Sequence, residues 1–151
     1  MKLKPRLINS LTDDKFRDYG LLLLRVGIGL IFVTIHGFPK ISGGIEKWTV
    51  YGKTFNNILG ISFIPGFWGF MAAISEFGGG ICLIAGVLFR PACALMLFTM
   101  LVAITAQFRG GYGFSGASQA LEMGIVLLSL IFTGSGRFTL PYLLLSKKRV
   151  M

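Results

Sequence analysis

The chain has 151 residues, of which 54% are hydrophobic and only 14% are charged, and its mean hydropathy is +0.74. This composition is too apolar for a soluble globular domain and predicts a membrane protein. The net charge of +9 does not indicate a nucleic-acid-binding protein, because the basic residues lie in loops and tails that flank apolar segments.

Four apolar segments are long enough to cross a bilayer as helices, and they are 21–38, 64–89, 91–108 and 117–133. The sequence therefore predicts an all-α membrane protein, a four-transmembrane-helix bundle that forms one domain over 1–151. Most Lys and Arg residues lie in the tails 1–18 and 141–151 and in the expected turn at Arg90-Pro91. This asymmetry predicts that both termini are cytoplasmic and that the protein is a multi-pass protein of the inner (plasma) membrane.

The connection between the first two segments is too polar to lie in lipid. Its apolar residues recur at three- and four-residue spacing and predict a short amphipathic helix at the membrane interface, in the first extracytoplasmic loop; they are Trp48, Tyr51, Phe55, Ile58 and Leu59. We expect this helix to cap the bundle. A lid over a ligand entrance is the alternative, because loops of this length are often functional.

Several ionisable residues lie within the apolar segments, where burial of a charge in the membrane costs free energy. Arg25 and His36 are separated by eleven steps of about 100°, which places them, with Gly29, on one face of an ideal helix. Glu76 lies near the middle of the second segment. A buried guanidinium needs a partner, so the sequence predicts an Arg25–Glu76 ion pair, and the alternative is that Arg25 reaches the lipid headgroups.

A second polar group is expected near the outer end of the bundle. His36, Gln107 and Glu122 all lie toward that end of their segments and, if they meet, form a pocket able to hydrogen-bond a carbonyl or relay a proton. The alternative for His36 is a solvated residue at a helix end. Glu76, His36 and Glu122 are the candidate catalytic residues, and Arg25 and Gln107 join them as candidate ligand-binding residues.

Small residues in the second segment predict close helix packing. The residues expected to pack are Gly29, Gly78, Gly79, Gly80 and Gly86. Cys82 and Cys93 lie in different segments without a CxxC motif and are interpreted as packing residues. No metal site is expected, because one histidine cannot form a His-rich site and no zinc motif is present.

Two motifs resemble those of the DoxX family of small bacterial membrane proteins. They are RVGIGLIFVTIHGFPK, with Arg25, Gly29, His36, Gly37 and Lys40, and EFGGGICLIAGVLFR, with Glu76, Gly79, Gly86 and Arg90. The resemblance covers about residues 20–140. It implies a four-helix membrane bundle and an association with quinol oxidase or thiosulfate:quinone oxidoreduction, although the chain lacks the extra soluble portion expected of a complete thiosulfate-oxidising enzyme.

Two hypotheses for function follow. The first is a redox-associated membrane subunit that binds a quinone or similar lipophilic molecule at the buried Arg, Glu and His residues. The second is a non-enzymatic scaffold or assembly factor in which Arg25 and Glu76 fix helix register. A small transporter is a weaker alternative, because no inverted repeat is visible. Candidate partners are the lipid bilayer, a membrane or cytoplasmic redox protein, and further copies of the chain.

Overall fold

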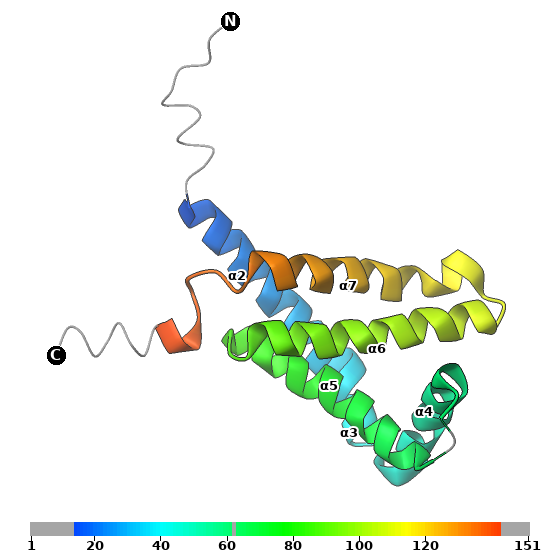
Figure 1. Cartoon of the computed structure of the whole chain (residues 1–151). Coiled ribbons are helices and arrows are strands. Elements are labelled where there is room, and N and C mark those ends of the chain that lie inside the picture. Colours follow the sequence, from blue (N-terminus) through cyan, green and yellow to red (C-terminus); the bar gives the residue numbers. More distant parts are fainter. Residues whose placement is uncertain (1–13, 62, 143–151) are drawn as a thin grey trace, which may run out of the picture.

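The computed structural model describes residues 14–61 and 63–142, and these residues form helices and no strand (Figure 1). The elements are α2 (Asp14–Ile31), the π-helix η1 (Phe32–Gly37), α3 (Phe38–Ile41), α4 (Gly44–Leu59), α5 (Pro65–Ala85), α6 (Phe89–Arg109) and α7 (Gly113–Thr133). Four helical stretches are long and apolar enough to cross a membrane, namely Lys15–Ile41, Pro65–Ala85, Phe89–Arg109 and Gly113–Thr133. The predicted all-α architecture with four spanning helices is confirmed.

The first spanning stretch is longer than the predicted segment 21–38, and it contains Lys40. Pro39 does not end it, because this proline lies in the first turn of α3, directly after the π-helix. A first-turn position needs no backbone N–H donor. The chain reversal between α5 and α6 also differs from the prediction: it falls at residues 86–88, so that Arg90 and Pro91 already belong to α6.

The helices α6 and α7 form an antiparallel hairpin, while α5 diverges from α6 away from the turn that joins them (Figure 1). Both ends of the described chain lie at one end of the bundle, here called the terminal end. Helix α4 lies at the opposite end, here called the loop end. The core contains fully buried side chains from all four spanning stretches, including Phe32, Leu83, Met96 and Leu127.

Helix α4 confirms the helix predicted in the first connection, and it packs on α5 at very short range. A side chain at Gly52 would meet the carbonyl of Pro65, and one at Gly69 would meet the carbonyl of Trp48. The Phe55 and Trp68 rings stack with their centroids 5.0 Å apart. The two backbones therefore touch where glycines remove the side chains.

Three of the expected packing glycines lie at helix contacts. Gly29 and Gly80 face each other between α2 and α5, and Gly79 faces Met96 of α6. Gly86 ends α5 with a positive φ of 69° and lies against Arg25. Gly78 does not fit the prediction, because the nearest atom to an added Cβ is Ile74 Cγ2 of its own helix, 3.9 Å away.

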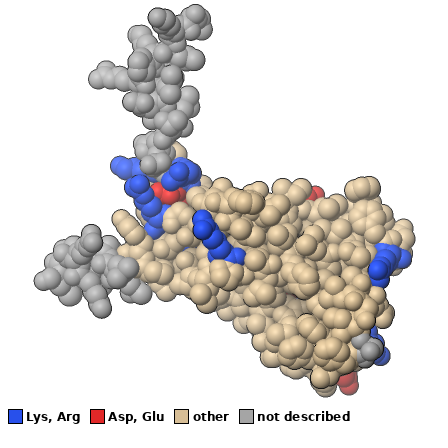
Figure 2. Space-filling view, in the orientation of Figure 1, with Lys and Arg blue, Asp and Glu red and all other residues tan. Residues whose placement is uncertain are grey.

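Charged side chains gather toward the two ends of the face in Figure 2, and the surface between them is largely uncharged. That distribution suits a bundle whose middle contacts hydrocarbon. The predicted basic tail 141–151 falls mostly outside the described residues, which end at 142.

Candidate ligand pocket

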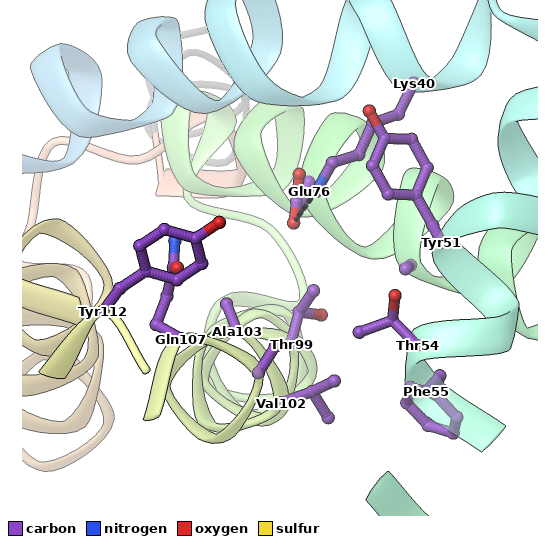
Figure 3. Close-up of a pocket in the computed structure, with 12 residues that line it drawn as sticks. Lys40, Tyr51, Thr54, Phe55, Glu76, Thr99, Val102, Ala103, Gln107 and Tyr112 are labelled. Atoms are coloured by element: carbon purple, nitrogen blue, oxygen red, sulfur yellow. Dashed lines mark hydrogen bonds and ion pairs between the residues drawn. The ribbon is translucent and has the colours of Figure 1, made fainter. Parts of the chain in front are cut away.

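Glu76 forms the buried ion pair of the bundle with Lys40. The Lys40 Nζ atom lies 2.5 Å from Glu76 Oε1 (Figure 3), and the two side chains are 21% and 1% exposed. The Lys40 ammonium also lies 5.1 Å from the centre of the Tyr51 ring. The backbone carbonyl of Lys40 accepts a hydrogen bond from Trp48 Nε1. Helix α4 therefore holds Lys40 in a fixed position against α5.

The prediction of an Arg25–Glu76 ion pair is wrong. Arg25 is 2% exposed and lies against Gly86 at the end of α5, ten residues from Glu76, or about 15 Å along the helix. Within the described part of the chain, the Arg25 Nε and Nη1 atoms have no hydrogen-bond partner. The carbonyl end of α5 carries partial negative charge, which favours a cation there.

Lys40 is missing from the predicted site because the predicted segment ends at residue 38, so that Lys40 falls in the connection that follows it. Two signals were available. Lys40 closes the first DoxX-like motif, and it follows His36 by four residues, which places both on one helix face.

Beside the ion pair lies a cavity of about 450 Å³, here called the polar cavity (Figure 3). Its polar lining comes from four helices and one turn: Lys40 of α3, Tyr51 and Thr54 of α4, Glu76 of α5, Thr99 and Gln107 of α6, and Tyr112 in the turn after α6. The apolar remainder includes Phe55, Ala72, Val102 and Ala103. Helix α4 thus supplies one wall of the cavity, which goes beyond capping the bundle.

A smaller hollow of about 150 Å³ lies on the other side of Glu76 and contains His36. It shares Lys40, Glu76 and Gln107 with the polar cavity. The His36 Nε2 atom lies 3.5 Å from Nε2 of Gln119 in α7. The structure therefore brings His36, Glu76 and Gln107 together, as predicted for His36 and Gln107, and adds Gln119.

Glu122 does not join them, and this part of the predicted pocket is wrong. Glu122 is exposed on α7 and lines neither hollow, whereas Gly116, Gln119 and Met123 face His36. Counting residues from the segment boundary gave the depth of Glu122 but not its direction around the helix. The π-helix adds a similar error within the first spanning stretch. Its wider turn shifts the residues after it, relative to Arg25, by about one position around the helix axis.

The cavity wall carries an unsatisfied acceptor. Glu76 Oε2 is buried and has no hydrogen-bond partner among the described residues. Lys40 and Gln107 supply donors to the same space, and the Tyr51 and Tyr112 rings supply flat apolar surface. Such a site can hold a planar molecule with carbonyl oxygens and exchange a proton with it.

Cys82 and Cys93 are both free thiols, and Cys93 is fully buried in the core. The interpretation of Cys93 as a packing residue agrees with this burial. Cys82 is half-buried and lines a separate apolar hollow.

Four apolar spanning helices that enclose a buried Lys–Glu pair define a multi-pass helical membrane protein with an internal polar pocket. A family model named DoxX matches residues 20–109, which is more than half of the chain. The chain belongs to the DoxX family. No curated protein and no solved structure shows a match to it.

Proposed function

We propose that this DoxX-family protein binds a quinone, or a lipophilic molecule of similar carbonyl chemistry, in the polar cavity beside Lys40 and Glu76. The observation that carries the proposal is the buried, unpaired Glu76 Oε2 atom on a wall whose other residues supply hydrogen-bond donors. An unsatisfied buried acceptor is costly, and the hydroxyl group of the reduced, quinol form of the ligand donates to it and removes that cost.

The dimensions of the site suit a ring-sized head group. The polar cavity of about 450 Å³ falls in the range of small-molecule sites, and aromatic side chains lie at its edge. Glu76 lies near the middle of α5, about 15 Å from either end. A head group beside Glu76 lies at the depth of the apolar spanning helices, which favours a lipophilic molecule.

Each residue has a distinct role in this proposal. Lys40 and Gln107 donate hydrogen bonds to a carbonyl oxygen of the ligand. Glu76 accepts a hydrogen bond from the reduced, hydroxyl form of the ligand and exchanges protons with it, with His36 behind it. The electrons come from a redox partner protein in the membrane or cytoplasm, so this chain acts as a membrane subunit of a redox system in the bacterial inner membrane, with both termini cytoplasmic.

The scaffold hypothesis loses part of its support, because Gly29, Gly79 and Gly80 are already used in contacts within the chain. They are not available to pack against a partner protein. It remains the alternative that a negative ligand test would favour.

Organic extraction of the protein purified in lipid nanodiscs, followed by mass spectrometry for quinones, tests the proposal. We expect near-stoichiometric quinone in the wild type, its loss in Glu76→Gln and Lys40→Met, and its retention in Arg25→Met, which alters a buried charge outside the cavity. Quinone at the level of empty nanodiscs in the wild type, or equal retention in all variants, would contradict it.

A further inference from the structure

A second hollow lies between α5 and α6 and differs from the polar cavity in chemistry. This apolar groove has a volume of about 310 Å³. Its lining includes Met71, Ile74, Gly78, Cys82, Pro91 and Leu95, and it contains no ionisable carboxylate, lysine or arginine. It runs toward the terminal end, where the turn between α5 and α6 closes it.

The apolar groove is continuous with the polar cavity through a linking hollow of about 200 Å³. Phe55, Ala72 and Thr99 line both the linking hollow and the polar cavity. Met71, Ser75 and Leu95 line both the linking hollow and the apolar groove. The three hollows therefore follow one seam between α5 and α6, polar near the loop end and apolar toward the terminal end.

Gly78 keeps the apolar part of this seam open. Its neighbours Gly79 and Gly80 are required by contacts with α6 and α2, whereas an added Cβ at Gly78 has only its own helix within 4 Å. Glycine costs about 1 kcal/mol relative to alanine in a helix. Internal packing does not explain why Gly78 is glycine, and an occupant of the groove does.

We propose that the apolar groove holds the hydrocarbon tail of the same molecule whose polar head binds beside Lys40 and Glu76. The ligand class is therefore a tailed quinone, with a carbonyl-bearing ring and one long apolar chain. This inference rests on the proposed function. The seam favours such a ligand over a phospholipid, because its polar end lies at Glu76, deep in the bundle, whereas a phospholipid head group stays at the membrane surface.

The test uses two probes, 2,3-dimethoxy-5-methyl-1,4-benzoquinone and its 6-decyl derivative, with binding to nanodisc-embedded protein followed by quenching of tryptophan fluorescence. Trp68 lines the linking hollow and reports on it. We expect Gly78→Leu to weaken binding of the decyl probe at least about tenfold, because the new side chain fills the groove. Binding of the tailless probe should stay within about twofold, as expected for a change away from its contacts.

Gly27→Leu is the matched control, because Gly27 is also helical and an added Cβ there, as at Gly78, meets no atom of another helix within 4 Å, but it lies on α2 away from the seam. It should leave both probes unaffected. Circular dichroism and size-exclusion chromatography check that both variants fold.

Two results would overturn the tail site: equal effects of Gly78→Leu on both probes, or no effect on either. Loss of co-purifying phospholipid in Gly78→Leu without a change in decyl-probe binding would also overturn it and assign the groove to lipid. Failure of the proposed function looks different. In that case the tailless probe does not bind to the wild type, or its reduced, quinol form binds Glu76→Gln equally well.

Discussion

Among the described residues three charged side chains are almost completely buried, those of Asp18, Arg25 and Glu76, and the last two lie in different surroundings. Glu76, at 1% exposed, pairs with Lys40 and lines both polar hollows. Arg25, at 2% exposed, packs against Gly86 at the end of α5 and lines none of the hollows described above. Burial of a charge alone therefore does not mark a ligand site. In this bundle, the feature that indicates a ligand site is an unpaired polar atom at the wall of a cavity.

Removal of the Lys40 ammonium gives the largest expected loss of stability. Lys40→Ala leaves the Glu76 carboxylate buried without its partner, and we expect it to lower the free energy of unfolding by about 3 to 5 kcal/mol. Denaturant titration in detergent micelles, followed by circular dichroism, measures this. Lys53→Ala, at an exposed lysine of α4, should change it by less than about 0.5 kcal/mol.

A second substitution identifies the cause of that loss. Glu76→Gln added to Lys40→Ala should restore part of the stability, because a neutral amide is less costly to bury than an unpaired carboxylate. An unchanged stability in the double variant would mean that packing of the lysine chain, and not its charge, supports the fold.

Substitution of two glycines that share a backbone conformation tests the packing around Arg25. Gly86 and Gly60 have φ values of 69° and 70°, but only Gly86 has neighbours, Arg25 and Thr139, where a Cβ would lie. We expect Gly86→Ala to cost about 2 to 3 kcal/mol of stability, and Gly60→Ala about 1 to 2 kcal/mol from backbone strain alone. Equal losses in the same unfolding assay would contradict the close packing of Arg25 against α5.

The fold was predictable from the sequence because hydropathy and segment length determine the number of spanning helices. The amphipathic spacing of Trp48, Tyr51 and Phe55 was enough to predict α4. The glycine contact between Gly52 and Pro65 was not predictable, because nothing in the sequence shows which helix lies opposite a glycine.

The site was predictable only in part. Depth along each helix follows from counting residues, and it predicts that His36 and Gln107 lie at one level, as they do in the smaller hollow. The same counting placed Glu76 deeper, beside Arg25, and did not predict that it lines this hollow as well. Direction around the helix does not follow from depth, and Glu122 was misplaced for this reason. Lys40 was missed because the apolar segment ends at residue 38 in the sequence, whereas the helical stretch continues to Ile41.

A pair of substitutions on α7 tests which of its polar residues belongs to the pocket. We expect Gln119→Leu to weaken quinone binding about threefold to tenfold, because it removes the hydrogen-bond partner of His36, which lies with Glu76 in the smaller hollow. Glu122→Gln should leave binding unchanged, because Glu122 is exposed and outside both hollows. Binding titrations of the tailless probe measure both effects, and a larger effect of Glu122→Gln would restore Glu122 to the site.

The smallest effect on stability is expected at Arg25, the second buried charge of this comparison. Because Nε and Nη1 of Arg25 have no hydrogen-bond partner in residues 14–61 and 63–142, Arg25→Met removes the desolvation cost of the guanidinium and keeps most of the packing volume. We expect the free energy of unfolding to rise by no more than about 1 kcal/mol. Arg25→Ala should instead lower it, because a shorter side chain leaves a cavity beside Gly86. A loss in Arg25→Met as large as that in Lys40→Ala would show that the guanidinium has a strong partner in the membrane, and the contrast between the two charges would then disappear.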